Sequence, residues 1–336
     1  MLGDIIHSTP KYWDDGTNTT VFVGANDGML HAFNAATGAE RFAYIPAVLI
    51  PKLPLLKVNP YAHKYFVDGQ LAARKYDTQS ILVGGLGGGG MGLYGLDITA
   101  VPTSETDAAT KILWEITNAS AGFANLGHTY GTPVLTILPN GTNALVVSNG
   151  YNNGCTNACN SGVNSAGNGH ATLFIINPVT GAKLGEMDTG SGTTTSPNGL
   201  SSPTLVDTNA DGIKDTAYAG DLDGNLWKFD LSDLTSTPTK LYTTNPARPI
   251  TMAPAFKQHP YGGRIVTFAT GQNYTTADNT DTSTNYAYGI WDRPSAYAAN
   301  AALLDQTLTE RSYTFTPASP VGASPQTLRV RTVTSL

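Results

Sequence analysis

The stretch Val21–Asn34, with the sequence VFVGANDGMLHAFN, decides the fold class of this chain. Two runs of alternating side chains flank the Asn-Asp-Gly segment at 26–28, and a second turn signal, Thr-Gly, follows at 37–38. Alternation with period two is typical of half-buried antiparallel strands, and an Asn-Asp-Gly segment favours a tight turn between them. The stretch therefore predicts a β-hairpin followed by a turn into a further strand.

The same pattern returns along the chain. Later copies combine a strand, a glycine-containing turn and a second strand, and they occupy residues 81–98, 144–177, 216–230 and, more weakly, 264–291. A second element precedes most copies, a small or polar residue before proline and then an apolar strand, at Pro10, Pro133, Pro203 and Pro254, with Phe66–Gly69 in its place before the second copy. Proline suits the first residue of a strand because its missing N–H costs nothing in the ladder there.

Each unit thus supplies about four strands, and four strands per repeat of roughly 60 residues describe a propeller blade. We therefore predict an all-β chain that forms a single β-propeller domain over residues 1–336, with five or more blades. The tail 327–333 is predicted to be another strand, and the chain is expected to be a fragment that stops before the ring closes. A β-sandwich with coincidental glycine-rich turns is the alternative fold.

The composition excludes several classes of function. Charged residues make up only 13% of the 336 residues and the formal net charge is −6, so the basic surface that nucleic-acid binding needs is missing. A polybasic membrane patch is missing for the same reason. No stretch approaches the ~20 apolar residues of a membrane-spanning helix, and the nearest candidate, 42–56, is interrupted by prolines and a lysine.

The two cysteines, Cys155 and Cys159, lie in a stretch rich in glycine and asparagine. A local disulfide is the preferred interpretation, and it would place the chain in an oxidising compartment. Zinc is an alternative, but a zinc site needs about four ligands, and only His170 lies nearby in the sequence. Two free thiols on a loop are the third interpretation.

Residues 207–215, with the sequence DTNADGIKD, predict a calcium site. Oxygen-bearing side chains alternate along the loop before a glycine, which matches the front of the calcium loop of helix–loop–helix proteins, including its backbone carbonyl after the glycine. Calcium prefers oxygen ligands, and three ionised carboxylates would repel one another without a cation. The ligands that the loop offers are Asp207, Asn209, Asp211, the Ile213 carbonyl and Asp215.

The end of the helix–loop–helix pattern is missing, because Tyr218 stands where that pattern has glutamate. We expect instead a calcium loop at the start of a strand, with Mg²⁺ disfavoured because it resists dehydration. A solvated turn is the alternative. Glycine-rich 84–92 resembles a phosphate loop only superficially and is interpreted as a floppy hairpin connection, and 278–281 is either a second acidic site or a plain polar loop.

Several stretches resemble known families. The units 24–33 and 36–38 look like the repeat of quinoprotein-dehydrogenase-type propellers. The chain is more closely similar to the C-terminal propeller of the PilY family, also called PilC, the type IV pilus biogenesis factors and tip adhesins. The stretches that carry this resemblance are 3–10, 23–33, 127–133, 207–215, 219–222, 225–230 and 288–292.

This resemblance implies a modified seven-bladed propeller with one bound calcium ion. By position, its ligands fall on Asp207, Asn209, Asp211, the Ile213 carbonyl and Asp215. In that family calcium occupancy supports pilus extension by opposing retraction. The chain is therefore expected to be a non-enzymatic, calcium-regulated adhesion and pilus-assembly module, exported through the periplasm to the bacterial cell surface. Its expected partners are pilus components such as minor pilins, together with host or abiotic surfaces.

Two other classes of function stay open. A pyrroloquinoline-quinone dehydrogenase would need adjacent cysteines against the cofactor and calcium held by scattered side chains, whereas the two cysteines here are separated and the calcium loop is local. A generic integrin-like propeller, in which calcium stabilises a scaffold, is the second class. The large N-terminal region and the final blades of the PilY family are expected to be missing from this chain.

Overall fold

The computed structural model describes residues 2–154, 166–293, 308–315 and 326–333. The chain divides into two compact units, Met1–Asp292 and Arg293–Leu336. In the second unit the strands β20 (Leu308–Phe315) and β21 (Gln326–Val333) pair antiparallel, so the strand predicted at 327–333 is confirmed. Among the residues just given, no helix is both long enough and apolar enough to cross a membrane.

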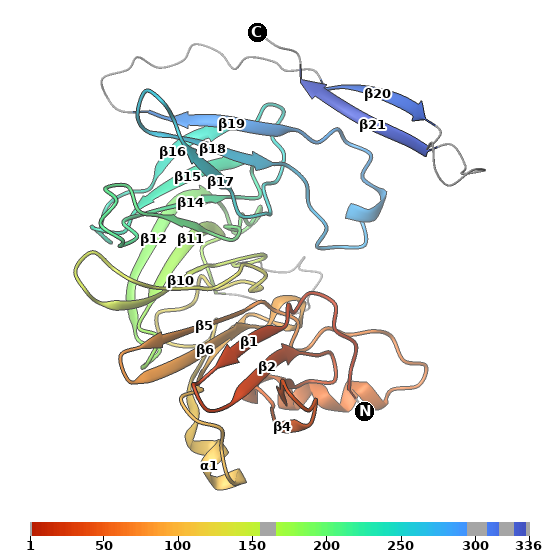
Figure 1. The fold of residues 1–336 in the computed structure, drawn as a ribbon, viewed down its shortest axis with the longest axis vertical. Coiled ribbons are helices and arrows are strands. Elements are labelled where there is room, and N and C mark those ends of the chain that lie inside the picture. Colours follow the sequence, from red (N-terminus) through yellow and green to blue (C-terminus); the bar gives the residue numbers. More distant parts are fainter. Residues whose placement is uncertain (1, 155–165, 294–307, 316–325, 334–336) are drawn as a thin grey trace. The chain divides into compact units, whose positions relative to one another are not determined.

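Four sheets of the first unit contain four antiparallel strands each (Figure 1). Strands that follow one another in the chain pair with one another, which is the arrangement of a propeller blade. The prediction of four strands per repeat is confirmed for these sheets. Sheet by sheet, the strands are β1 (Lys11–Asp14), β2 (Thr19–Gly24), β3 (Leu30–Asn34) and β4 (Glu40–Tyr44); β5 (Leu71–Tyr76), β6 (Gln79–Gly85), β7 (Gly92–Asp97) and β8 (Ile112–Thr117); β9 (Val134–Ile137), β10 (Asn143–Ser148), β11 (His170–Ile176) and β12 (Lys183–Gly192); β13 (Thr204–Val206), β14 (Thr216–Gly220), β15 (Asn225–Asp230) and β16 (Thr239–Thr243).

The fifth sheet of this unit has three strands within the described residues: β17 (Ala255–Gln258), β18 (Arg264–Ala269) and β19 (Ala287–Asp292). The hairpin β18–β19 coincides with the weaker fifth copy of the sequence pattern at 264–291. The five predicted copies therefore correspond to five sheets. Closure of a ring and a seven-bladed total stay predictions.

Proline stands directly before the first strand of four of these sheets: Pro10 before β1, Pro133 before β9, Pro203 before β13 and Pro254 before β17. The first strand of each sheet pairs with the second strand alone, so it has an open side. A residue without an N–H is tolerated at the start of such a strand. The second sheet lacks this proline, and residues 66–69 precede its β5, as the sequence predicts.

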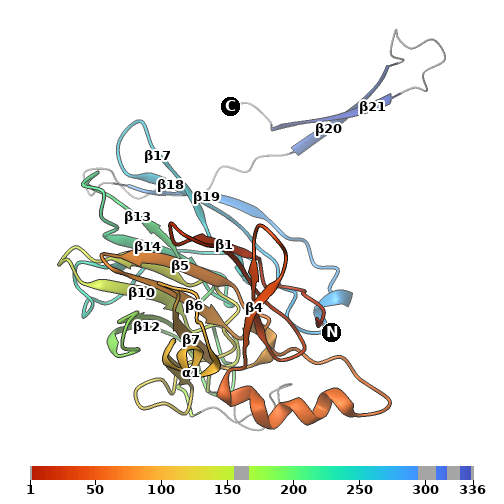
Figure 2. The same cartoon turned by 60° about the horizontal axis from the view of Figure 1, so that its bottom comes forward.

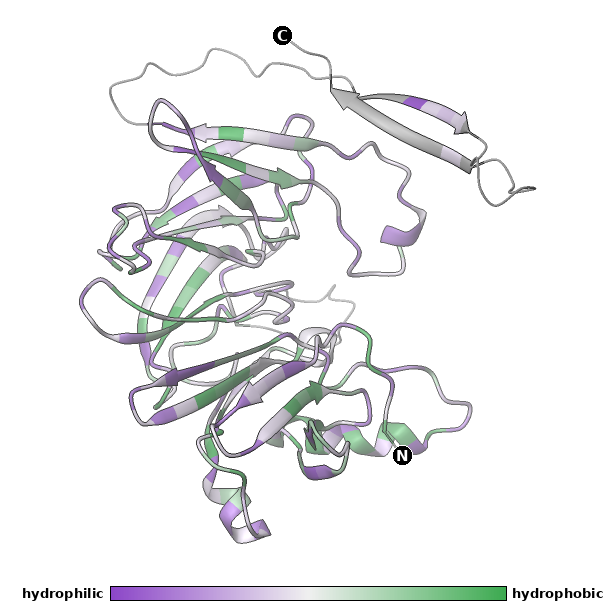
Figure 3. Cartoon of the chain, viewed as in Figure 1, coloured by the Kyte–Doolittle hydropathy of each residue, from purple (hydrophilic) through white to green (hydrophobic). Residues whose placement is uncertain are grey.

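Four hydrophobic clusters hold neighbouring sheets together. They join the first sheet to the second, the second to the third, the third to the fourth and the fourth to the fifth. In β6, Leu82 packs into the first of these clusters, whereas Ile81 and Val83 pack into the next. Because side chains alternate across a strand, a sheet can give both faces to cores that it shares with its neighbours. Figure 3 shows hydrophobic residues concentrated on these strands.

Tyrosine hydroxyl groups add polar ties between the sheets. Tyr44 of β4 donates to the carboxylate of Glu115 on β8. Tyr76 of β5 donates to a backbone carbonyl of β9 at 3.0 Å, and Tyr218 of β14 donates to Asp292 on β19. Burial is the main cause that raises the pKa of each of these tyrosines, so each hydroxyl keeps the proton that its hydrogen bond needs.

Short helices occupy some of the connections. Their bounds are η1 (Ala47–Lys57), η2 (Gly87–Gly89), α1 (Glu105–Thr110) and η3 (Asp278–Thr280). The longest, η1, connects the first sheet to the second and is drawn in orange in Figure 2. Sequence analysis did not predict it, because Pro51 and Pro54 lie inside it and its apolar residues show no helical period.

The connection between β6 and β7, residues 86–91, is called the glycine connection below. Leu86, Gly87 and Gly89 are buried, and a Cβ atom added to Gly89 would lie 1.6 Å from the carbonyl oxygen of Phe66. Only a residue without a side chain allows two backbone segments to approach so closely. The segment does join two strands of a hairpin, as predicted, but the prediction that it is floppy is wrong.

Candidate metal centre

The predicted calcium loop, residues 207–215, connects β13 to β14 in the fourth sheet. The loop closes on itself because the Asp215 amide donates to the Val206 carbonyl at 3.0 Å. The Asp215 carbonyl in turn accepts from the amide of Leu231, at 2.7 Å, at the end of the next hairpin. Both ends of the loop are therefore fixed by the strands of one sheet.

The backbone of the loop turns sharply at two residues with positive φ. Gly212 has φ +90°, and a Cβ atom added there would meet nothing within 4 Å. Conformation rather than space therefore explains glycine at this position. Ala210 also has a positive φ, +64°, which sequence analysis missed because alanine is not a residue that signals this conformation.

The side chains of the loop accept hydrogen bonds from its own amides. Asp207 accepts from Ala210 N through Oδ1 at 2.6 Å and from Gly212 N through Oδ2 at 2.7 Å. Asp211 accepts through Oδ1 from the amide of Ile213 at 2.7 Å. Bonds of this kind are typical of aspartate-rich turns and keep the carboxylates folded over the loop.

Asn209 and Asp211 are paired with each other. The Asn209 side-chain amide donates to Asp211 Oδ2 at 2.9 Å, and Asn209 Oδ1 accepts from the Asp211 backbone amide at 3.1 Å. These two predicted ligands are therefore held side by side. For Ile213, the predicted carbonyl ligand, the contact described is that of its amide with Asp211 Oδ1.

Asp215 differs from the other carboxylates of the loop. Its Oδ2 accepts from the amide and the hydroxyl of Thr208, at 2.9 and 2.7 Å. Its Oδ1 is buried and has no hydrogen-bond partner. A buried carboxylate oxygen without a partner is unfavourable, so this atom has a vacant place for a donor or a cation.

The set of donors fits calcium, because every predicted ligand is an oxygen. Each carboxylate oxygen of Asp207 and Asp211 keeps a second lone pair beside the one that accepts an N–H, and Asp215 Oδ1 accepts none. The side chains have not converged on one point, however. Within the described part of the chain, no three acidic, histidine or cysteine side chains lie close enough together to hold a metal ion. The calcium assignment for Asp207, Asn209, Asp211, Ile213 and Asp215 stays a prediction.

The electrostatics of the loop keep Asp207 ionised. Partial desolvation raises the pKa of Asp207. The hydrogen bonds from the backbone amides of Gly212 and Ala210 outweigh this effect and hold the pKa below its usual value. The positive charge of Lys214 acts in the same direction. From β18 in the fifth sheet, Arg264 donates through Nη2 to the Asp207 carbonyl at 2.9 Å. Sequence analysis missed this arginine, which lies far away along the chain.

The sequence also suggested a disulfide, a zinc site and a second acidic site. Cys155 and Cys159 lie outside the described residues, so their disulfide stays a prediction. His170, the nearby histidine of the zinc alternative, contacts Asp188 through Nδ1 at 2.9 Å. In the segment 278–281, Asp278 accepts from the amides of Tyr274 and Thr275, at 2.8 and 2.7 Å, as a carboxylate in a polar loop does.

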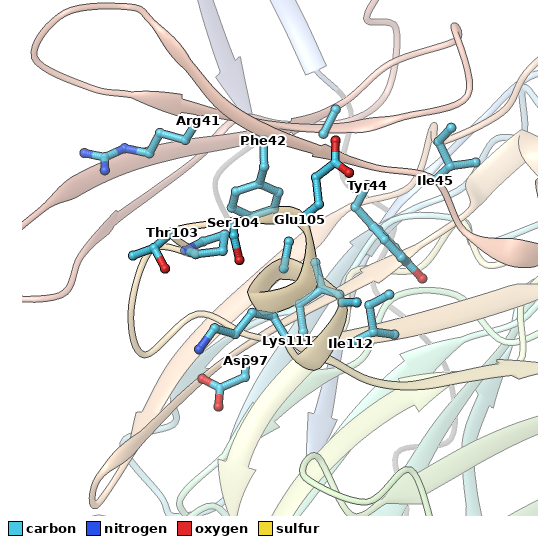
Figure 4. A pocket seen from close by; sticks show the side chains of 15 residues that line it. Arg41, Phe42, Tyr44, Ile45, Asp97, Thr103, Ser104, Glu105, Lys111 and Ile112 are labelled. Atoms are coloured by element: carbon cyan, nitrogen blue, oxygen red, sulfur yellow. The ribbon is translucent and has the colours of Figure 1, made fainter.

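A cavity of about 690 Å³ lies between β4 and α1 (Figure 4). Its lining mixes both signs of charge, with Arg41 and Lys111 beside Asp97 and Glu105. Asp97 accepts from the side-chain amide of Gln79 at 3.1 Å, so part of this charge is already satisfied within the chain. The cavity has no concentration of one charge that would select a ligand.

The chain is similar in sequence and in fold to proteins of one known family. A model of the PilY1 beta-propeller domain matches residues 7–247 of the chain. The chain belongs to the PilY1 β-propeller family. The type IV pilus biogenesis factor PilY1 of Pseudomonas aeruginosa (strain UCBPP-PA14) is 34% identical over an alignment 391 positions long, which covers 94% of this chain and 32% of that protein. A PilY1 homolog of Xylella fastidiosa is 34% identical over an alignment 320 positions long, which covers 87% of this chain and 20% of that protein.

The chain therefore spans between a fifth and a third of these curated PilY1 relatives. Among solved structures, it is similar to the crystal structure of the Pseudomonas aeruginosa PilY1 C-terminal domain. That match has a TM-score of 0.70 and 33% sequence identity, and it covers 93% of this chain and 66% of the other. The predicted family and the predicted all-β propeller fold are confirmed.

Proposed function

We propose that this chain is a non-enzymatic propeller module of a type IV pilus biogenesis factor, and that its loop 207–215 binds one calcium ion. The curated PilY1 relatives are named as type IV pilus biogenesis factors, which supports the first part. One observation carries the second part: Asp215 Oδ1 is a buried carboxylate oxygen with no partner, in a loop whose other side-chain ligands are also oxygens.

The residues that would hold the ion are Asp207, Asn209, Asp211, the Ile213 carbonyl and Asp215. When bound, calcium supplies positive charge that offsets the mutual repulsion of three carboxylates. The chain itself holds these oxygens within one short turn. It does so through the hydrogen bonds that the Asp207 carboxylate accepts from backbone amides and through those that Asp215 accepts from Thr208.

One contact connects the calcium loop to the neighbouring sheet, so that calcium binding can affect more of the propeller than the loop. Arg264 of the fifth sheet bonds to the Asp207 carbonyl, so ordering of the loop stabilises a contact between two sheets. In our proposal this ordering regulates pilus extension against retraction and surface attachment at the bacterial cell surface. Minor pilins and host or abiotic surfaces are the proposed partners. A scaffold propeller that calcium merely stabilises is the competing function.

Titration calorimetry with calcium tests the binding part. We expect the wild-type chain to bind one calcium ion and Asp211→Ala to give no binding heat. A matched control is Asp233→Ala, because Asp233 also caps its own exposed turn, accepting from the Thr235 amide at 3.0 Å, elsewhere in the same sheet. Equal heats for wild type and Asp211→Ala would refute the calcium site, whatever the family.

Counting pili tests the regulatory part. Bacteria that make the full-length protein with Asp211→Ala are compared with bacteria that carry Asp233→Ala. We expect fewer surface pili for Asp211→Ala alone. If calcium binding is lost while the pilus count is unchanged, calcium has only a scaffold role and the regulatory proposal is wrong.

A further inference from the structure

A second cavity, of about 470 Å³, lies where connections of the first three sheets meet. It is called the lysine pocket below. Its walls come from η1, from residues 63–66, from the glycine connection, and from Asn118 and His128. None of these lining residues belongs to a strand. Binding sites are often built from loops that a rigid scaffold positions, so this location is a reasonable one for a ligand.

The charged lining of the lysine pocket has one sign: Lys52 and Lys64 line it, and no aspartate or glutamate does. Two histidines line it as well. His63 contacts Asp4 Oδ2 through Nε2 at 2.7 Å, and burial lowers the pKa of His128, so the positive charge comes from the two lysines. The chain as a whole has 25 acidic residues against 19 lysines and arginines, so a lining without any carboxylate contrasts with the rest of the molecule. Such a cavity concentrates positive potential and attracts anions.

Lys52 is the central charge of the lysine pocket. Its Nζ donates to the Gly89 carbonyl at 2.7 Å, which uses one of the three N–H groups of an ammonium. In the described part of the chain it has no carboxylate within ion-pair distance, and burial lowers the pKa of Lys52. A partly buried cation without a counterion is unfavourable, and a bound anion would remove that cost.

The glycine connection presents its backbone to this lysine. A Cβ atom on Gly90 would lie 3.7 Å from Lys52 Nζ, so the absence of a side chain leaves the space beside the ammonium open. The Gly87 carbonyl lies 3.2 Å from His128 Nδ1. Because a carbonyl can only accept, this nitrogen carries the proton, and the ring is held in one orientation. The polar groups of the pocket are therefore pre-positioned.

Much of the remaining wall is apolar. Leu49, Phe66 and Leu86 are at most 1% exposed, whereas Val48 and Leu55 are 40% and 42% exposed and offer apolar surface to a ligand. Cavities of roughly 300–1,000 Å³ with apolar walls and a few polar groups are the usual sites for small molecules. The lysine pocket has that size, and its polar groups select an anionic head while its wall accepts an apolar body.

We propose that the lysine pocket binds a small organic anion, a carboxylate or a phosphate monoester on an apolar body, with Lys52 as its charge partner. This site is separate from the calcium loop and does not depend on the proposed function. The two anionic heads share the chemistry that Lys52 recognises, and the experiment distinguishes them.

Titration calorimetry uses four probes: hexanoate, hexyl phosphate, hexan-1-ol and inorganic phosphate. We expect hexanoate, hexyl phosphate or both to bind, and hexan-1-ol to bind at least tenfold more weakly, because it lacks the charge. Inorganic phosphate, which lacks the apolar body, is also expected to bind more weakly. Hexan-1-ol binding as tightly as the anions, or no binding of either organic anion, would overturn the proposal.

Variants locate the site. Lys52→Met is expected to weaken binding of the organic anions at least tenfold, whereas Lys57→Met, at an exposed lysine on the same helix outside the pocket lining, leaves it unchanged. Gly90→Asp is a second variant, because its carboxylate would occupy the space beside Lys52, and Gly90→Asn is its neutral control. The backbone of Gly90 is extended, with φ 165°, so both substitutions suit it. Wild-type affinity in both Lys52→Met and Gly90→Asp would refute the assignment.

Discussion

Two connections that contain glycine, the glycine connection at 86–91 and the calcium loop at 207–215, are held in place by different means. The glycine connection is buried, and its Gly89 lies against the backbone of a distant segment at Phe66. The calcium loop is largely exposed, and its own side chains bond to its own amides. What a residue contributes to the order of its connection therefore differs between the two. In the glycine connection it acts through packing against a distant segment, and in the calcium loop through hydrogen bonds within the loop.

The same comparison shows what each connection can do. The glycine connection cannot move without disturbing the first core, so it is suited to hold a pre-formed pocket. The calcium loop touches few other segments, so its order can depend on a ligand or on pH. Substitutions in the two connections should therefore differ in how much they lower the free energy of unfolding and in how far that effect depends on calcium and pH.

The largest effect is expected for Gly89→Ala. The added Cβ would lie 1.6 Å from the Phe66 carbonyl oxygen, so the backbone must shift, and overpacking of this kind costs about 3 kcal/mol in the free energy of unfolding. Gly212→Ala is the matched control, because its Cβ meets no atom and only its φ of +90° is unfavourable, at about 1 kcal/mol. Urea unfolding of both variants in EDTA measures the difference. Equal losses would show that the two glycines have the same role.

The second prediction concerns calcium itself. At a calcium concentration about 100 times the Kd, binding to the folded chain alone raises the free energy of unfolding by about 2.7 kcal/mol. We expect this gain in the wild type and in Gly89→Ala, whose defect is remote from the loop, but not in Asp211→Ala. Urea unfolding with calcium or EDTA measures it. A gain that persists in Asp211→Ala would place the ion elsewhere.

The third prediction concerns the arginine that ties the calcium loop to the fifth sheet. Arg264→Gln removes the bond to the Asp207 carbonyl and should weaken calcium binding roughly fivefold, equivalent to about 1 kcal/mol. Arg41→Gln is the control, because Arg41 donates to a backbone carbonyl in the first sheet, that of Thr19. Calorimetry measures the affinities, and hydrogen exchange should quicken at 207–215 only in Arg264→Gln. Identical calcium affinities for the two variants would show that this tie does not support the loop.

The smallest effect is expected from pH. The pKa of Asp207 is held below its usual value of 3.8, so its ionised form stabilises the folded chain. That contribution is complete above pH 3.8 and is lost as the pH falls through the lower pKa of the folded state. In EDTA, Asp207→Asn should therefore flatten the fall of stability with pH in this acid range. If the plots of unfolding free energy against pH have the same slope for wild type and variant in this range, the hydrogen bonds that the Asp207 carboxylate accepts do not stabilise the loop.

The sequence predicted those features that local pattern determines. Alternating residues and turn signals located the paired strands of five sheets, and prolines marked the start of four of them. The position of Gly212 in the calcium-loop pattern also agrees with its positive φ, because a positive φ is a local property. The family resemblance added the identity of the chain.

Features that depend on distant segments were not predicted. The sequence gives no sign that Phe66 packs against Gly89, that Arg264 reaches the calcium loop, or that Lys52 lies over the glycine connection. Each of these contacts joins segments separated by tens of residues, and each depends on how neighbouring sheets pack. The burial of a glycine-rich segment was missed for the same reason, since composition alone suggested mobility.

Because neighbouring sheets share hydrophobic clusters, the sheets of the first unit should unfold in a definite order. Among the described residues of Met1–Asp292, the second, third and fourth sheets each contribute side chains to two hydrophobic clusters, whereas the first and fifth sheets contribute to one cluster each. The strand β17 of the fifth sheet is exposed throughout. Unfolding of this unit should therefore begin at the first or the fifth sheet and proceed inward, with the third sheet the last to lose its amide protection.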